Sequence, residues 1–162
     1  METSFYETNK AVSEYLLFHY GKPDDLLLNG VGSTEVLDFP SRCGELHQGF
    51  KLNRSRALDL GCAVGGAAFA MSQSFDEVVG IDFSHALIES AQRMASESEI
   101  AIPIAVEGEL TRDIPVSLPP KTQPHRVHFE QGDAMNLAPQ LGRFDFILMA
   151  NLIDRLPDPA SC

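Results

Sequence analysis

Apolar and polar positions alternate over residues 56–151 in a way that predicts strands separated by helices. Four short apolar runs have the composition of parallel strands covered on both faces: 57–60, 76–84, 126–133 and 143–151. Helical spacing follows the first run over 65–75 and the second over 85–98, where Ser84 is the predicted N-cap. This alternation predicts an α/β fold with a Rossmann-like, doubly wound and mostly parallel sheet.

The segments outside this alternation have patterns of their own. Residues 5–20 space their apolar and aromatic side chains as an amphipathic helix does, and Gly21 and Pro23 end it. Residues 24–53 are expected to be irregular because they carry turn signals: Asn29-Gly30, Gly32-Ser33 and Phe39-Pro40. Residues 100–125 hold several prolines and alternating apolar positions, which indicates an excursion such as a hairpin before the next strand.

The last predicted strand, 143–151, is the most apolar, and the chain ends soon after it in LPDPASC. An open doubly wound sheet normally has more strands than those predicted here. We therefore expect a sheet that is incomplete at the C-terminus, with this strand near an edge where its backbone groups are unpaired. Such an edge offers a route to a homo-oligomer.

Composition narrows the classes of partner. A chain of 162 residues fits one domain with a sizeable core, and 44% hydrophobic with 22% charged residues is typical of a soluble globular protein. The formal net charge of −11 argues against nucleic acid or an anionic membrane as the main partner. No apolar run has the length of a transmembrane helix, about 18 residues, and the N-terminus lacks a signal-peptide pattern. Cys43, Cys62 and Cys162 include no CxxC pair, so reduced thiols in a cytoplasmic compartment are expected.

A burst of small residues separates the first predicted strand from its helix. Gly61, Ala63 and Gly66 nearly match the G-x-G-x-x-G pattern, with Ala in the middle position. Such a turn lets a ligand approach the backbone and presents amides at a helix N-terminus. The same residues also fit a tight turn that holds no ligand.

Acidic residues near the ends of three predicted strands indicate which kind of nucleotide cofactor the site would bind. Asp82 follows Gly61 by 21 residues, where a carboxylate accepts hydrogen bonds from ribose hydroxyls or caps the next helix. Asp59 precedes Gly61 by two positions and Asp133 follows the third strand. A pyrophosphate would be repelled by these acids, whereas the sulfonium and ammonium of S-adenosylmethionine would be attracted. Together with Gly65, this set favours S-adenosylmethionine over NAD.

The same motifs resemble the class I S-adenosylmethionine-dependent methyltransferases. The resemblance is carried by Asp59-x-Gly61-x-x-x-Gly65, Gly80-Ile81-Asp82, Gly132-Asp133-Ala134, and Phe144-Asp145 leading to Ala150-Asn151-Leu152. More closely, the chain is similar to the mercaptohistidine N-methyltransferase domain of ovothiol biosynthesis. That likeness runs along nearly the whole chain through residues 6–8, 13–21, 37–40, 42–43, 57–65, 75–85, 107–111 and 155–159. One departure is Gly66-Ala67-Ala68, where we expect a larger and more polar helix start.

The resemblance implies a division of the chain and a set of site residues. It implies an N-terminal helical and irregular cap over 1–53 and the N-terminal part of a Rossmann-like methyltransferase domain over 54–162. The implied cofactor-binding residues are Asp59, Gly61, Cys62, Ala63, Gly65, Asp82, Phe83, Gly132, Asp133, Ala134 and Asn151. Candidate contacts to the small-molecule substrate, mercaptohistidine, are Tyr6, Tyr15, His19, Arg42 and Asn151, each of which also fits a packing, turn or surface role.

The expected reaction moves a methyl group from the sulfonium to an imidazole nitrogen, and no residue is assigned as catalytic base. Two other interpretations stay open: a truncated, non-catalytic remnant that binds cofactor or assembles through its last strand, and a less favoured NAD-binding module. No metal site is expected, because His125 and His128 are three apart on a predicted strand and so point to opposite faces.

Overall fold

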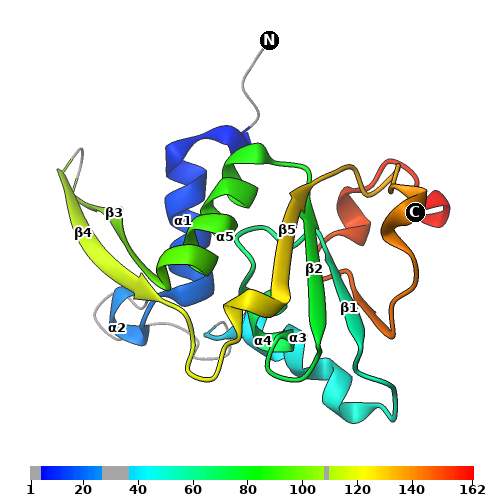
Figure 1. Cartoon of the computed structure of the whole chain (residues 1–162). Helices are drawn as coiled ribbons and strands as arrows, with labels where there is room; N and C mark the ends of the chain where they lie inside the picture. The colour runs from blue at the N-terminus through cyan, green and yellow to red at the C-terminus, as the bar shows by residue number, and fades with distance from the viewer. Residues whose placement is uncertain (1–4, 27–36, 108–109) are drawn as a thin grey trace.

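The computed structural model describes residues 5–26, 37–107 and 110–162 and shows a parallel sheet at its centre (Figure 1). The sheet has the strand order β5-β2-β1-β6. Its strands are β1 (Arg56–Leu60), β2 (Glu77–Asp82), β5 (Val127–Gln131) and β6 (Phe146–Leu148). All neighbouring strands pair in parallel. The prediction of a Rossmann-like, mostly parallel sheet is confirmed, and the chain order changes direction beside β1, where such sheets bind ligands.

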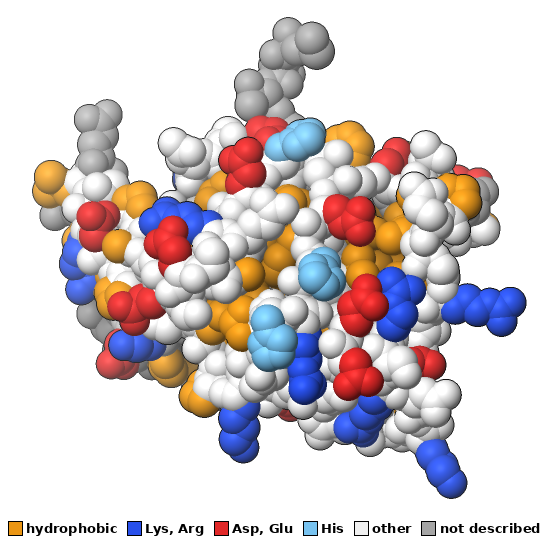
Figure 2. All heavy atoms as spheres, in the orientation of Figure 1, with side chains coloured by type: hydrophobic (Ala, Val, Ile, Leu, Met, Phe, Trp, Pro, Cys, Tyr) orange, Lys and Arg blue, Asp and Glu red, His pale blue; other side chains and the backbone are white. Residues whose placement is uncertain are grey.

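Helices cover one face of this sheet. They are α1 (Asn9–Tyr20), α4 (Gly66–Met71) and α5 (His85–Glu97), and they share one buried cluster with Ala57, Val78 and Phe129 of the strands. Leu58 and Ile81 point to the other face, where residues 134–152 pack against them without a helix of more than one turn in the described chain. Figure 2 shows hydrophobic side chains between α5 and β5, where the helix lies on the sheet.

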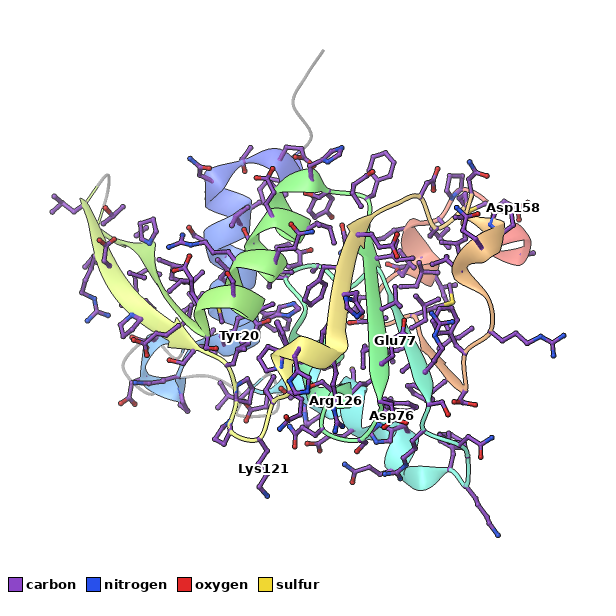
Figure 3. The ribbon with its side chains drawn as sticks, in the orientation of Figure 1. Tyr20, Asp76, Glu77, Lys121, Arg126 and Asp158 are labelled. Carbon is purple, nitrogen blue, oxygen red and sulfur yellow. The ribbon has the colours of Figure 1, made fainter. Side chains whose placement is uncertain are left out.

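An ion pair joins the amino ends of β1 and β2, at the end of the sheet away from the cavity described below. Arg56 at the start of β1 donates through Nε to Glu77 of β2 over 2.8 Å. Figure 3 places Glu77 and Asp76 at the amino end of β2, away from the C-terminal segment that carries Asp158.

The N-terminal third is more ordered than its sequence pattern suggests. The predicted helix begins at Asn9 rather than Phe5, because Thr8 caps it by accepting from the Ala11 amide, and Phe5–Glu7 form the 3₁₀ helix η1. The prediction that residues 24–53 are irregular is wrong for the described part. That part contains α2 (Pro23–Leu26), α3 (Phe39–Glu45) and η3 (Leu46–Gly49).

The turn signals in this segment have different outcomes. The proline of Phe39-Pro40, taken as a turn signal, lies in the first turn of α3, because its fixed φ and missing amide suit that position. Asn29-Gly30 and Gly32-Ser33 lie outside the described residues, as does part of the motif 107–111.

The predicted excursion over 100–125 contains a β-hairpin that forms a separate two-stranded sheet, on the side of α5 away from the central strands (Figure 1). Its strands β3 (Glu99–Glu107) and β4 (Leu110–Ser117) pair antiparallel, and Ile102 and Ile114 extend the core into it. The placement of His125 and His128 on one strand is wrong, because the prolyl residue before His125 starts the short helix η4 (Pro124–Arg126) and only His128 belongs to β5.

The last strand is short and lies at the sheet edge. Only Phe146–Leu148 of the predicted run 143–151 form β6, which bonds β1 on one side and leaves Ile147 53% exposed. Beyond it come η6 (Ile153–Arg155) and η7 (Pro159–Ser161). Among the described helices, none combines the length and apolarity needed to cross a bilayer.

Candidate functional site

A cavity of about 670 Å³ opens at the carboxyl ends of the parallel strands. It is lined by residues at the carboxyl end of each strand or just beyond it: 59–63 for β1, 81–84 for β2, 132–135 for β5 and 150–152 for β6. Residues from both ends of the chain complete the wall: Tyr6, Tyr15 and His19 from the N-terminal part and 155–157 from the C-terminal part. The volume is typical of a small-molecule site.

The glycine-rich turn after β1 depends on residues that tolerate positive φ. Gly61 has a φ of 77° and Gly65 a φ of 88°, and a Cβ at Gly65 would lie only 2.5 Å from Cζ of Phe129. Gly65 therefore faces the Phe129 ring and does not line the cavity, unlike every other predicted cofactor residue. The turn therefore has two surfaces: Gly65 packs against Phe129, and Gly61 to Ala63 line the cavity.

Gly66 explains the departure at the start of α4. A Cβ there would lie 2.5 Å from Nδ1 of His19, and the Gly66 amide donates to that nitrogen over 3.1 Å. The larger, more polar residue expected at this position would displace the His19 ring, so glycine is required by α1 rather than by the loop itself.

His19 is held as a neutral donor. Because Nδ1 accepts the Gly66 hydrogen bond, the ring proton lies on Nε2. Burial lowers the pKa of His19 to about 3, which keeps it neutral. Next to it, the Tyr20 hydroxyl at the end of α1 (Figure 3) donates to the Val64 carbonyl over 2.6 Å, so α1 is fastened to the turn at two points.

Asp82 ties the end of β2 to the turn. Its Oδ2 accepts from the Ala63 amide over 2.9 Å and its Oδ1 from the Ser84 amide over 3.0 Å. Ser84 is the N-cap of α5, as predicted, and accepts from the Leu87 amide. Burial raises the pKa of Asp82, against these hydrogen bonds. Asp82 thus bonds the amide of the Ser84 N-cap at the start of α5, and it also lines the cavity, where its predicted bond to ribose hydroxyls stays a prediction.

Asp59 is the most unusual acid of the cavity. Its side chain is 3% exposed, and its Oδ2 has no hydrogen-bond partner within the described chain. Burial raises its pKa to about 7, a hydrogen bond from the Ala68 amide opposes the rise, and the Asp82 charge adds to it. An orphaned carboxylate oxygen at a cavity wall is the arrangement that a cationic ligand group would complete.

The remaining predicted cofactor residues surround these two acids. Phe83 is 70% exposed at the cavity wall. Asp133 accepts from the Met135 amide over 2.9 Å, and the Gly132 amide donates to the Asp82 carbonyl over 2.9 Å. Asn151 has a φ of 55°, so the turn after β6 is tight. Cys62 is buried, consistent with a small packing residue.

Residues of η1 form part of the cavity wall and are fastened to the start of α5. Glu7 accepts from the His85 and Ala86 amides over 3.0 and 3.2 Å, and Ser84 Oγ donates to the Tyr6 carbonyl over 3.0 Å. The η1 turn therefore caps the N-terminus of α5. We call residues 5–8 the N-terminal strap.

Of the substrate candidates, Tyr6, Tyr15, His19 and Asn151 line the cavity and Arg42 does not. Sequence reasoning assigned no chemistry to Glu7 or Arg155, which also line it. Arg155 belongs to a string that carried the family resemblance, but its contact with Tyr6 joins residues 149 positions apart. No spacing rule brings such a pair together.

Strand order, a glycine turn and acids at the strand ends together define a Rossmann-like, nucleotide-binding class of α/β domain. Residues 33–162 match the family described as "Methyltransferase domain", and the chain belongs to this family. It is a methyltransferase domain of the S-adenosylmethionine-dependent class, and S-adenosylmethionine is the cofactor of that class. The unpartnered Asp59 oxygen and the adjoining Asp82 fit the cations and hydroxyls of that cofactor.

Three known proteins illustrate what this chain is similar to, each at low sequence identity. Over 78 residues it is 30% identical to a carboxy-S-adenosyl-L-methionine synthase from Alteromonas mediterranea, covering 46% of this chain and 32% of that protein. The solved structure of EvdMO1 matches 98% of this chain and 32% of its own, with a TM-score of 0.53 and 17% identity. A putative S-adenosyl-L-methionine-dependent methyltransferase from Methanococcus maripaludis matches 85% of this chain and 47% of its own, at 14% identity and a TM-score of 0.49. The chain thus spans a third to a half of these proteins.

Proposed function

We propose that this chain transfers the methyl group of S-adenosylmethionine to an imidazole nitrogen of mercaptohistidine, a step of ovothiol biosynthesis. The observation that carries the methyl-donor part is the buried, unpartnered Asp59 oxygen beside Asp82 in a cavity at the strand ends. The acceptor part is supported by the sequence strings that resemble the mercaptohistidine enzyme.

In this proposal three acids bind three different parts of the cofactor. Asp59 faces the ammonium and sulfonium side, because a buried carboxylate oxygen with no hydrogen-bond partner attracts a cation. Asp82 accepts from the ribose hydroxyls and keeps its bonds to Ala63 and Ser84, since a carboxylate offers about four acceptor sites. Asp133 meets the adenine amino group. Gly61, Cys62, Ala63, Phe83, Gly132, Ala134 and Asn151 form the surrounding walls.

The chain's own contribution to the reaction is position and shielding. The bound cofactor supplies an electrophilic methyl group, so the protein needs chiefly to align the acceptor nitrogen with the sulfur–methyl bond. Residues of the strap and of α1 form part of the cavity wall, and the strap is fastened to the start of α5. A base is needed only if the attacking nitrogen carries a proton, and His19, neutral and fixed in one tautomer, is a hydrogen-bond donor rather than a base at neutral pH.

Calorimetric titration with S-adenosylhomocysteine tests the proposal. Asp82→Ala is expected to weaken binding about 10–100-fold, the range for hydrogen bonds to a charged group. Asp113→Ala, on the exposed side of β4 away from the cavity, is the matched control and should bind as the wild type does. Equal affinity of Asp82→Ala and wild type would overturn the cofactor site. Methyl transfer to mercaptohistidine is then assayed on the wild type.

A second candidate rests on the edge of the sheet. β6 bonds only β1 among the described strands, and Ile147 is half exposed, so a non-catalytic chain that assembles through this edge is the alternative. A folded chain that binds cofactor, forms a homo-oligomer and methylates nothing would support it. The three free cysteines support a reducing, cytoplasmic location for either candidate.

A further inference from the structure

The charge of the cavity wall is one-sided. Its acids are Glu7, Glu14, Asp59, Asp82 and Asp133. Against these five carboxyl groups, the described lining contains a single Lys or Arg, Arg155. The other basic side chain, His19, is neutral. Among the described lining side chains, Arg155 is therefore the positively charged partner for a ligand carboxylate.

Tyr6 contacts one side of the Arg155 guanidinium. Its Nη1 donates to the Tyr6 hydroxyl, and its Cζ lies 5.8 Å from the centre of the Tyr6 ring. None of the ion pairs between described residues includes Arg155. A guanidinium has five N–H donors in a planar fork, so the bond to Tyr6 leaves further donors for a ligand.

The position of Arg155 separates it from the proposed cofactor contacts. Of the three acids proposed for the cofactor, Asp59 lies in β1, Asp82 ends β2 and Asp133 follows β5. Arg155 lies in η6, after β6 and Asn151. Asp59 and Asp82 form the deeper wall, and Arg155 is exposed at the mouth. A ligand carboxylate at Arg155 would therefore lie on the β6 side of the cavity, whereas the three acids lie on the β1, β2 and β5 side.

We propose that Arg155, oriented by Tyr6, binds a carboxylate of the methyl acceptor, and that the acceptor is for this reason an amino acid or a related carboxylate. This inference rests on the proposed function and adds to it the residue that selects the substrate class. Arginine matches a carboxylate with two parallel N–H···O bonds, which a lysine cannot do. Arg42, the sequence-based candidate for this role, does not line the cavity.

The test uses the full chain saturated with S-adenosylhomocysteine, so that no turnover is needed. Two probes are titrated calorimetrically: mercaptohistidine and its decarboxylated amine. The variants are Arg155→Gln, Arg155→Lys and Tyr6→Phe. Arg93→Gln is the control, because Arg93 pairs with Glu97 on the outer side of α5 and does not line the cavity.

Arg155→Gln is expected to weaken mercaptohistidine binding about 10–100-fold. Arg155→Lys should recover part of the loss and Tyr6→Phe should lose less than Arg155→Gln. The decarboxylated amine should bind all variants equally, and the affinity for S-adenosylhomocysteine should change by less than about twofold. In a catalytically active preparation the same loss should appear in KM for mercaptohistidine with kcat little changed.

Four results would overturn the inference. One is equal mercaptohistidine affinity in wild type and Arg155→Gln, and a second is no binding of either probe to the loaded chain. A third is a loss of S-adenosylhomocysteine affinity alone in Arg155→Gln, which would show that the guanidinium binds the cofactor carboxylate. The fourth is an equal loss for both probes, which would mean a structural role. Failure of the wild type to bind S-adenosylhomocysteine would instead remove the proposed function itself.

Discussion

The two sides of the cavity are built differently. On the strand side, the Asp82 carboxylate reaches the turn at Ala63 through a bond spanning 19 residues, and the acids follow strands that are adjacent in the sheet. On the cap side, the strap meets α5 across 78 residues and η6 across 149. We call the strap, α1 and η6 the cap side of the cavity. The strand side is built from repeated strand-and-helix units that are near in sequence, whereas the cap side depends on contacts between segments far apart in sequence. We therefore expect substitutions on the strand side to cost more.

The largest effect is expected at Gly65 on the strand side. Gly65→Ala must adopt a φ of 88° and bring a Cβ within 2.5 Å of Phe129, which should lower the free energy of unfolding by about 2–4 kcal/mol. Gly49→Ala, where a Cβ would meet nothing within 4 Å, is the control and should change stability by less than about 0.5 kcal/mol. Urea unfolding measures both. Equal free energies of unfolding for the two variants would contradict the expectation that the strand side is the more sensitive to substitution.

Asp59→Asn is expected to stabilise the ligand-free chain and to weaken cofactor binding. Because burial raises the pKa of Asp59 to about 7 from 3.8, the folded state holds a proton that the unfolded state has lost between those values. The stability that this proton gives is complete below about pH 4 and is lost as pH rises through 7.

The advantage of Asp59→Asn over wild type should therefore grow from pH 5 to pH 8, to about 1–3 kcal/mol. Thermal unfolding across that range measures it. A wild-type stability that rises between pH 5 and pH 8 relative to Asp59→Asn would show that Asp59 is charged in the folded state.

A smaller effect is expected at Tyr20 on the cap side. Tyr20→Phe removes the hydroxyl that donates to the Val64 carbonyl over 2.6 Å, and it should lower the free energy of unfolding by about 1 kcal/mol. Chemical unfolding of both chains measures the difference. A loss as large as that of Gly65→Ala would mean that the cap side is as strongly determined as the strand side.

The smallest effect is expected at Glu7 in the strap. Its pKa is lowered, first by a hydrogen bond with Ser84 and also by the His85 and Ala86 amides. Its contribution is therefore present above the ordinary pKa of 4.5 and is lost as pH falls through the lower folded value. Glu7→Gln should cost less than about 1 kcal/mol at pH 7. Melting curves at pH 7 and pH 3 test this, and a difference that persists at pH 3 would contradict it.

The sequence predicted most of the strand side. Alternating runs located β1, β2 and β5, Ser84 was correctly placed as an N-cap, and Asp59, Asp82 and Asp133 lie around one cavity. These features depend on short-range periodicity and on the rule that the carboxyl ends of parallel strands meet. The sheet edge at β6 was also expected, although the strand is shorter than its apolar run.

The cap side was predicted less well, for physical reasons. Helix α3 has no long amphipathic pattern and was taken as irregular. The need for Gly66 comes from His19, which lies 47 residues away. Arg155 acquires its surroundings only through Tyr6, at the other end of the chain. Contacts of this kind are set by tertiary packing, and no propensity or spacing encodes them.

The central claim is that Asp59 and its neighbours form a site for the cofactor's cationic end. Its most direct test is the proton balance of S-adenosylhomocysteine binding at pH 6, measured calorimetrically in two buffers of different ionisation enthalpy. If the ligand ammonium meets Asp59, the wild type should release close to one proton per ligand and bind more tightly as pH rises toward 7, while Asp59→Asn should release almost none. Binding by both chains with the same proton release would contradict the account.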